Sequence, residues 1–414
     1  MTKITDIPAI RFKGFSDTWE QRKVGDLLIE RNQQAPMSDE YPLMAFIANE
    51  GVAQKGDRYD RSALVTDTAN KLYKKTEIGD FIYSSNNLET GSIGLNKYGK
   101  ACISPVYSIF EPTGIADSDF LGRRLVRKDF INAMVKWRQG VIYGQWRIHE
   151  SDFLKIEIPV PSVVEQRKIG AYLDQLDRLI TLHQRKYDKL TNVKKSMLEK
   201  MFPQNGSNVP EIRFKGFTEA WEQRKLSEIA TMHARIGWQN LRTSEFLDSG
   251  DYMLITGTDF IDGAVNFDTC HYVERERYEQ DKHIQIRNGS ILITKDGTLG
   301  KVAYIQGLTM PATLNAGVFN VEIKDENEVD NRYLFQYLKA PFLMDYVDKK
   351  ATGGTIKHLN QNILVDFPVV LPHKAEQEKI GEYFLAIDHL ITLHQRELEK
   401  LKNLKKACLE KMFV

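Results

Sequence analysis

PSVVEQRKIGAYLDQLDRLITLHQRKYDKLTNVKKSMLEKMF, residues 161–202, is the stretch that decides the fold. Residues 372–413 repeat it at an offset of 211 positions, with 25 of 42 residues identical, including Ile-Thr-Leu-His-Gln-Arg and Leu-Glu-Lys-Met-Phe. Neither copy contains a proline after its first residue. Proline breaks helices because it lacks the N–H that a helix interior needs. Each block is therefore predicted to form one helix of about 35–40 residues, ~50–60 Å long.

Apolar residues in both blocks recur at alternating intervals of four and three, which is the heptad seam of a coiled coil. Lys194 and Lys405 interrupt the seam at the same place in the two copies. A helix with one apolar stripe needs a partner, and antiparallel pairing of the two copies is the arrangement we expect; parallel pairing with a second chain also fits the pattern. The predicted seam consists of Ile169, Leu173, Leu176, Ile180, His183, Tyr187, Leu190, Met197 and Met201 in the first helix, and Ile380, Phe384, Ile387, Ile391, His394, Leu398, Leu401, Cys408 and Met412 in the second.

His183 and His394 occupy equivalent seam positions near the middle of their helices. Antiparallel pairing would bring them face to face near a local two-fold axis. A polar residue in a seam commonly sets the register of the two helices, and we expect that role here. Metal binding or pH sensing is the alternative.

A second, shorter repeat precedes each long block. Residues 8–23, PAIRFKGFSDTWEQRK, recur as PEIRFKGFTEAWEQRK at 210–225, with 12 of 16 residues identical. Residues 24–160 and 226–371, which lie between the repeated blocks, differ almost throughout. Uniform drift after a duplication would spread the differences evenly, so the contrast indicates a shared scaffold with two separate specificities. The chain is accordingly divided into a first domain at 1–160, a first long helix at 161–202, a second domain at 203–371 and a second long helix at 372–414.

The composition is that of a soluble globular protein, with 42% hydrophobic and 27% charged residues in 414. No apolar run approaches the ~20 residues of a membrane span, and the first residues lack the apolar core of a signal peptide. The three cysteines are far apart and form no CxxC pair. We therefore expect a cytoplasmic protein with no disulfide framework and no bound metal.

The charge is distributed unfavourably for a nucleic-acid binder. Residues 24–160 carry 17 Lys+Arg against 18 Asp+Glu, and residues 226–371 carry 14 against 20. Binding to DNA needs cations against phosphate. The cations would have to be concentrated on one face, or partners would have to supply them.

Both divergent domains are predicted to be mixed α/β. In the first, strands at 81–84 and 101–104 enclose a polar loop; in the second, strands at 290–294 and 301–305 flank a hairpin turn. Helices are predicted at 130–138 and 333–339, followed by glycine-marked loops at 140–147 and 353–360. These loops carry Arg, Lys, Asn, Gln, Ser and Thr, which read base edges and hold phosphates. For any single one of these residues, a solvated loop position is the alternative.

The sequence contains no catalytic motif. It lacks the Asn/Asp-Pro-Pro-aromatic tetrapeptide of adenine methyltransferases, a GxxxxGK[ST] phosphate loop, HExxH and GxSxG. Gly297 to Lys301 has the wrong spacing for a phosphate loop, and Glu322-Ile-Lys324 is too short a nuclease-like match to carry weight. The sequence therefore favours a protein that is not an enzyme.

The doubled Arg-Phe-Lys-Gly-Phe…Trp segment and the doubled Pro-x-x-x-Glu-Gln before each long helix resemble the specificity subunit of type I restriction–modification systems. With the two divergent domains, the resemblance covers essentially the whole chain. It implies two target-recognition domains held apart by two antiparallel coiled-coil helices, each domain reading one half of a bipartite site in double-stranded DNA. It also implies docking of two methyltransferase subunits, which use S-adenosylmethionine, and of two restriction subunits, which use ATP and Mg²⁺. This chain itself would bind no cofactor.

On this interpretation, direct DNA contacts are expected from the polar and basic loops of both domains. A scaffold for two protein partners is the alternative from another class, and the steep salt dependence of DNA binding would distinguish the two. A fused restriction–methylation enzyme is a further alternative, which the missing motifs argue against. The candidate DNA-binding residues are Ser85, Asn86, Asn87, Lys97, Lys100, Tyr143, Gln145 and Arg147 in the first domain, and Lys295, Thr298, Lys301, Asn315, Thr355, Lys357 and His358 in the second.

Overall fold

The structure, a computed structural model, describes residues 7–54, 71–86, 88–142, 145–204, 206–350 and 359–414. The chain forms two compact units: unit 1 comprises residues 1–184 and 396–414, and unit 2 comprises residues 185–395. Each unit contains a head and part of both long helices, α5 (Val163–Lys200) and α11 (Lys374–Lys411). No helix in the described ranges is apolar enough over a sufficient length to cross a membrane.

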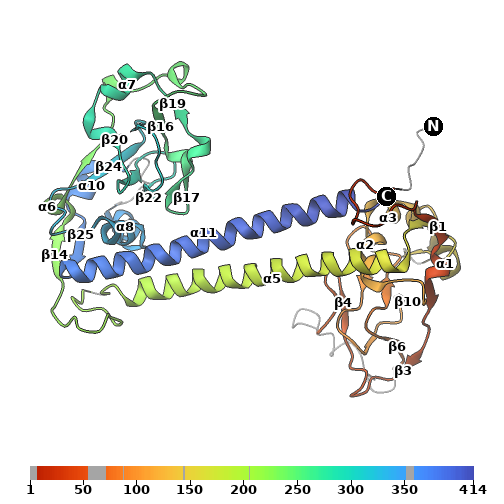
Figure 1. Cartoon of the computed structure of the whole chain (residues 1–414). Helices are drawn as coiled ribbons and strands as arrows, with labels where there is room; N and C mark the ends of the chain where they lie inside the picture. The colour runs from red at the N-terminus through yellow and green to blue at the C-terminus, as the bar shows by residue number, and fades with distance from the viewer. Residues whose placement is uncertain (1–6, 55–70, 87, 143–144, 205, 351–358) are drawn as a thin grey trace. The chain divides into compact units, whose positions relative to one another are not determined.

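The head of unit 1, in which Figure 1 labels β10, is built on a four-stranded antiparallel sheet with the order β2-β10-β7-β8. A three-stranded sheet, β3-β6-β9, and the pairs β1–β13, β4–β5 and β11–β12 complete its β-structure. Its elements are β1 (Glu20–Lys23), α1 (Val24–Leu27), β2 (Leu28–Glu30), β3 (Gln34–Ala35), β4 (Ala45–Ile47), β5 (Gly51–Ala53), β6 (Tyr73–Thr76), β7 (Phe81–Tyr83), β8 (Ile93–Leu95), β9 (Ala101–Ile103), β10 (Ser108–Pro112), α2 (Ser118–Arg124), α3 (Lys128–Val135), β11 (Gln139–Ile142), β12 (Gln145–Arg147), α4 (Glu150–Phe153) and β13 (Glu157–Val160).

The head of unit 2 contains a matching antiparallel sheet, β15-β24-β21-β22, although its sequence differs from that of the first head. A second four-stranded sheet, β19-β16-β23-β20, and the pairs β14–β25 and β17–β18 complete it. Its elements are β14 (Glu222–Lys225), α6 (Leu226–Ile229), β15 (Ala230–His233), η3 (Gly237–Gln239), η4 (Thr243–Glu245), β16 (Met253–Ile255), η5 (Gly257–Asp259), β17 (Phe260–Ile261), β18 (Ala264–Val265), η6 (Phe267–Thr269), β19 (His271–Tyr272), α7 (Arg275–Glu279), η7 (Lys282–Ile284), β20 (Gln285–Ile286), β21 (Ile291–Thr294), β22 (Val302–Tyr304), β23 (Ala312–Leu314), β24 (Val318–Ile323), α8 (Asn331–Lys339), α9 (Phe342–Lys350), α10 (Gln361–Val365) and β25 (Pro368–Leu371).

Two local predictions from the sequence are wrong. The polar stretch after β7 is not a single loop, because β8 lies within it and pairs with β7. The glycine-marked stretch at 140–147 belongs to the β11–β12 hairpin. In both cases a short element of three or four residues is too brief to leave a periodic pattern.

The two long helices pair antiparallel, as contacts inside each unit show. In unit 1, the Lys405 ammonium near the end of α11 lies 2.5 Å from the Asp177 carboxylate in the first half of α5. In unit 2, Lys194 near the end of α5 lies 2.6 Å from Asp388 in the first half of α11. The predicted fold class is therefore confirmed. The two lysines that interrupt the seam each form an ion pair with the other helix, at equivalent positions in the two units.

The predicted seam positions are all buried or half-buried, and His183 and His394 are half-buried. Their expected role in setting register stays a prediction. The division of the chain into two domains and two separate helices also stays a prediction.

Burial of Lys194 predicts a pH dependence of the stability of unit 2. Burial, together with the nearby Lys339 ammonium, lowers the pKa of Lys194 to about 8 despite the attraction of Asp388. The unfolded chain, with an ordinary lysine pKa of about 10.4, then binds more protons than the folded chain between pH 8 and 10.4. The free energy of unfolding of unit 2 should therefore gain up to roughly 3 kcal/mol across that window from this residue.

Urea titrations at pH 7.5, 9 and 10 test this expectation. Lys194→Met should lose the gain, whereas Lys405→Met, at the equivalent position in unit 1, should keep it. If the free energy of unfolding of the wild type changes with pH in the same way as that of Lys194→Met, the lowered pKa of Lys194 is contradicted.

The short repeat fastens each head to both helices. In unit 1, the Ile10 amide donates to the Lys411 carbonyl at 2.9 Å, and Arg11 makes two 2.7 Å hydrogen bonds to Glu165 at the start of α5. In unit 2, Ile212 and Arg213 make the equivalent contacts, to Lys200 at the end of α5 and to Glu376 at the start of α11. The Glu carboxylates are fully or almost fully buried. The two repeats are nearly identical because each makes the same contacts, which hold a head on both long helices. We call this set of contacts the clamp.

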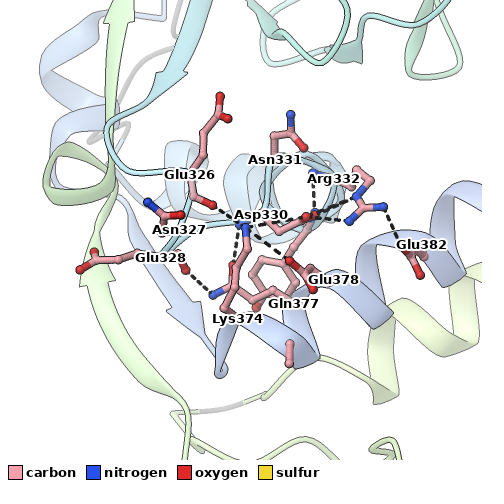
Figure 2. Close-up of polar contacts among 12 residues, drawn as sticks. Glu326, Asn327, Glu328, Asp330, Asn331, Arg332, Lys374, Gln377, Glu378 and Glu382 are labelled. Carbon is pink, nitrogen blue, oxygen red and sulfur yellow. Dashed lines mark hydrogen bonds and ion pairs between the residues drawn. The ribbon is translucent and has the colours of Figure 1, made fainter.

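A second contact of the clamp joins the start of a long helix to a short helix of the head, and Figure 2 shows it in unit 2 between α11 and α8. The Gln377 amide donates to the carbonyls of Pro372 and Glu328, and its oxygen accepts from the Asp330 amide. Asp330 in turn caps α8, and Gly381 lets that first turn approach α11, because a methyl group there would lie 2.9 Å from the Tyr333 nitrogen. Gln166, Asp117 and Gly170 make the same arrangement in unit 1.

The phenylalanine that ends each long repeat is buried in an aromatic cluster. In unit 2, Phe202 is 1% exposed and its ring lies 5.6–6.3 Å from the rings of Trp221, Tyr333, Tyr337, Phe342 and Phe384. In unit 1, Phe413 packs against Trp19 and Phe120. Each head is therefore packed against the start of one long helix and the end of the other.

Candidate nucleic-acid interface

The candidate interface begins with two loops that have the same place in the two heads. The β7–β8 connection of unit 1 and the β21–β22 connection of unit 2 join equivalent strands, because both sheets have the same order and the same antiparallel pairing. Ser85 and Asn86 lie on the first of these loops, and Lys295 and Thr298 lie on the second. These two loops, which have unrelated sequences, are therefore structural counterparts in the two heads.

In unit 1, this loop lies beside the β11–β12 hairpin. The Ser85 hydroxyl accepts a hydrogen bond from the Ile148 amide at 3.1 Å, just beyond β12. Arg138, just before β11, makes two 2.7 Å hydrogen bonds to Glu89 on the loop. Arg147 on β12 is exposed, and Ser85 and Asn86 are half-buried. The contacts bring together two groups of predicted residues that are some 60 positions apart in sequence.

In unit 2, four of the predicted residues gather at one end of the sheet. The Lys295 amide donates to the Gly317 carbonyl at 2.9 Å, which joins the β21–β22 loop to the β23–β24 loop that carries Asn315. The Thr294 hydroxyl accepts from the Lys301 amide at 3.0 Å and closes the loop on itself. Thr298 and Lys301 are exposed, whereas Lys295 is half-buried with its ammonium 5.4 Å from the centre of the Phe319 ring.

The segment after α9 also reaches this loop, because the Leu359 amide donates to the Lys295 carbonyl at 2.8 Å. The equivalent contact in unit 1 is that between Ile148 and Ser85. In each head, the loop of the sheet hairpin therefore lies next to the segment that leads back to a long helix. This helix is α5 in unit 1 and α11 in unit 2. Both segments were selected from the sequence as candidate DNA contacts.

Lys97 and Lys100 are not part of this group, because they follow β8 and lie at the other end of the hairpin. The Lys97 ammonium is 2.9 Å from Asp174 on α5 and 3.2 Å from Asp119. Burial opposes charge on Lys97, but the two carboxylates outweigh it and raise the pKa of Lys97. The Lys100 ammonium pairs with Glu40, which raises its pKa. Both lysines therefore hold contacts within unit 1.

Several candidates fall outside the described residues. Their DNA contacts stay predictions, as do those of the candidates placed above. They are Asn87, Tyr143, Thr355, Lys357 and His358, together with the side chain of Gln145 on β12.

Sequence reasoning missed a third loop of unit 2, which follows β16 of the second sheet and lies beside the β23–β24 loop. The Asn315 amide donates to the Ile255 carbonyl at 2.9 Å, which places the residues after β16 beside the β23–β24 loop. The hydroxyls of Thr256 and Thr258 lie 2.7 Å apart there, and Thr258 is exposed. The available signal was a glycine between two threonines directly after the apolar run Met253–Ile255.

Comparison with known proteins gives a consistent result. The family model described as "Type I restriction modification DNA specificity domain" matches residues 16–192 and again 218–403. The type I restriction enzyme MjaVIII specificity subunit of Methanocaldococcus jannaschii is 24% identical over 412 residues, which is 94% of this chain and 91% of that protein. The putative MjaX specificity subunit of the same organism is 25% identical over 272 residues, which is 64% of this chain and 60% of that protein.

Among solved structures, the S subunit of a type I restriction–modification system from M. genitalium aligns with a TM-score of 0.59 at 16% identity, covering 99% of each chain. The likeness shows that the two proteins share a fold. Together with the two matches of the family model, it accounts for the duplicated heads and the paired helices. The chain therefore belongs to the family of type I restriction–modification DNA specificity proteins, the non-catalytic subunits that carry the DNA-recognition domains of these systems.

Proposed function

We propose that each head reads one half of a bipartite site in double-stranded DNA. The observation that carries the proposal is that polar and basic loops occupy the same end of the same sheet in two heads whose sequences have diverged. A shared framework presenting different side chains is what two separate half-sites require, because bases are distinguished by the hydrogen-bonding groups placed against their edges. The proposed contacts are the candidate residues at this end of the sheets, which are Ser85, Asn86 and Arg147 in the first head and Lys295, Thr298, Lys301 and Asn315 in the second.

We also propose that the assembled complex supplies the chemistry. Two methyltransferase subunits would bring S-adenosylmethionine, and two restriction subunits would bring ATP and Mg²⁺. The long helices, which run through both units, would set the gap between the half-sites. The acidic balance of residues 226–371 fits a head that grips DNA within the complex, where partner subunits add cations against phosphate.

Alanine substitutions in the unit 2 loops test the proposed reading surface. Asn315→Ala removes a side chain suited to a base edge. It should lower the free energy of discrimination between the correct and the wrong base in one half-site by about 1–3 kcal/mol. Lys295→Ala with Lys301→Ala should weaken binding to all sequences and reduce the slope of log K against log salt by about 2. The measurements are affinity at several salt concentrations and the pattern of methylated adenines, made on the complex with its methyltransferase subunits.

Lys282→Ala serves as the matched control, because this exposed lysine of η7 lies outside the three loops. It should leave both readouts near wild type. If the loop variants behave like Lys282→Ala, the loops do not touch DNA. If the salt slope of the wild-type complex is close to zero, the head binds a protein partner instead.

A further inference from the structure

Two histidines and a glutamate meet on the surface of the second head. His233 is the last residue of β15, Glu322 lies on the neighbouring strand β24, and His283 lies on η7. The Glu322 Oε2 atom is 3.5 Å from His233 Nε2 and 3.9 Å from His283 Nδ1. Suitable donor atoms of the three residues all lie within 4.8 Å of one another.

We propose that these three residues bind a divalent transition-metal ion, with Zn²⁺ as the expected occupant. Two imidazole nitrogens and one carboxylate oxygen form a donor set that suits borderline ions such as Zn²⁺, whereas Ca²⁺ and Mg²⁺ prefer oxygen ligands alone. Ligand bonds of about 2.0–2.2 Å require the three donors to close slightly around the ion. His233 is half-buried while His283 and Glu322 are exposed, so the latter two have room to make that adjustment.

The local contacts hold the donors close together. The two imidazole rings are stacked with their centres 4.5 Å apart, and both present a nitrogen to the same carboxylate oxygen. Asn320 on β24 donates to the His283 carbonyl at 2.9 Å, which holds η7 against the strand. The Thr231 hydroxyl, 3.0 Å from His233 Nε2, is the contact that a bound ion would replace.

The position of the site indicates a structural role. β15 and β24 belong to one sheet, whereas η7 leads directly into β20 of the other sheet. An ion held by all three ligands would therefore cross-link the two sheets of this head. Glu322 pairs with Thr231, while the candidate DNA loop adjoins Val318 at the opposite end of β24. The ion would stabilise the head without touching the proposed reading loops.

The proposal departs from the sequence-based expectation of no bound metal. The three ligands are tens of residues apart and follow no spacing typical of metal sites. Only the pairing of β15 with β24 and the packing of η7 on that edge bring them together.

Titration of the full, untagged chain with ZnCl₂ by calorimetry tests the site, with CoCl₂ absorption as the spectroscopic readout of imidazole coordination. The wild-type chain should bind one ion through these residues and unfold at a higher temperature when the ion is present. His283→Ala and Glu322→Gln should each weaken that binding by at least about tenfold, the lower limit typical even for changes outside the ligand shell. Metal-free melting curves should match wild type, because both side chains are exposed.

His271→Ala is the matched control, since it removes an exposed histidine of the same head and should leave the affinity unchanged. The proposal is overturned if the wild-type chain takes up no ion. It is equally overturned if His283→Ala and Glu322→Gln bind as tightly as His271→Ala does, because the ion would then lie elsewhere.

Discussion

Glu376→Ala is expected to lower the free energy of unfolding of unit 2 by about 3–5 kcal/mol, because Glu376 is fully buried and its loss leaves the half-buried Arg213 guanidinium without its partner. The Arg213 side chain is 12% exposed, and both of its hydrogen bonds to Glu376, at 2.7 and 2.8 Å, would be lost. Desolvation of an unpaired charge is what makes the loss large. Glu165→Ala should have a comparable effect on unit 1, where Arg11 makes the equivalent pair.

Urea titration, combined with hydrogen exchange of peptides from each unit, measures the effect and locates it. The control is Lys225→Ala, which breaks a 2.8 Å ion pair to Asp366 whose two side chains are more than half exposed. A surface pair of that kind is worth no more than about 1 kcal/mol. Equal losses in Glu376→Ala and Lys225→Ala would show that the repeated arginine does not clamp the head to the helix.

Phe202→Ala should also cost unit 2 about 3–5 kcal/mol, the range found when a buried phenylalanine is truncated. Its ring fills the space among five aromatic rings supplied by the head and by α11, and alanine would leave a cavity there. Since Phe202 stands just beyond the end of α5, the substitution should loosen that end of the helix as well as the head.

Thermal melting and hydrogen exchange in residues 185–202 report both effects. Leu390→Ala is the control, because that side chain is 41% exposed on α11 and its loss should change stability by no more than about 0.5 kcal/mol. Unchanged exchange at the end of α5 in Phe202→Ala would mean that the last residues of the repeat do not anchor the helix.

The paired helices and the duplicated plan could be predicted because their signals are long. A heptad pattern over 38 residues, present twice, leaves little freedom of interpretation. The partners of Lys194 and Lys405 could not be predicted, because a seam pattern does not show that a charged residue will meet Asp388 or Asp177 on the other helix. That information exists only once the helices are paired antiparallel.

The heads were less predictable, since strands of two to six residues carry weak patterns and tertiary packing decides their pairing. The strands β7 and β21 could be recognised from apolar runs, but their equivalence follows from sheet order and not from any shared residues. Loop composition found Lys295 and Lys301 together, yet it could not show that Lys97 faces Asp174 on α5. Composition identifies polar loops, whereas the fold decides which of them face the same way.

The central claim, that the heads choose the DNA sequence and the helices only carry them, is tested most directly by exchanging one head. Residues 24–160 would be replaced by the counterpart from a relative with a different target, with both copies of the short repeat and both long helices left intact. The methylated adenines would then be mapped in a genome that carries the hybrid and its methyltransferase partner. One half of the modified site should change to that of the donor, while the other half and the gap stay the same. A modified site in which neither half changes, or in which both halves change, would contradict the account.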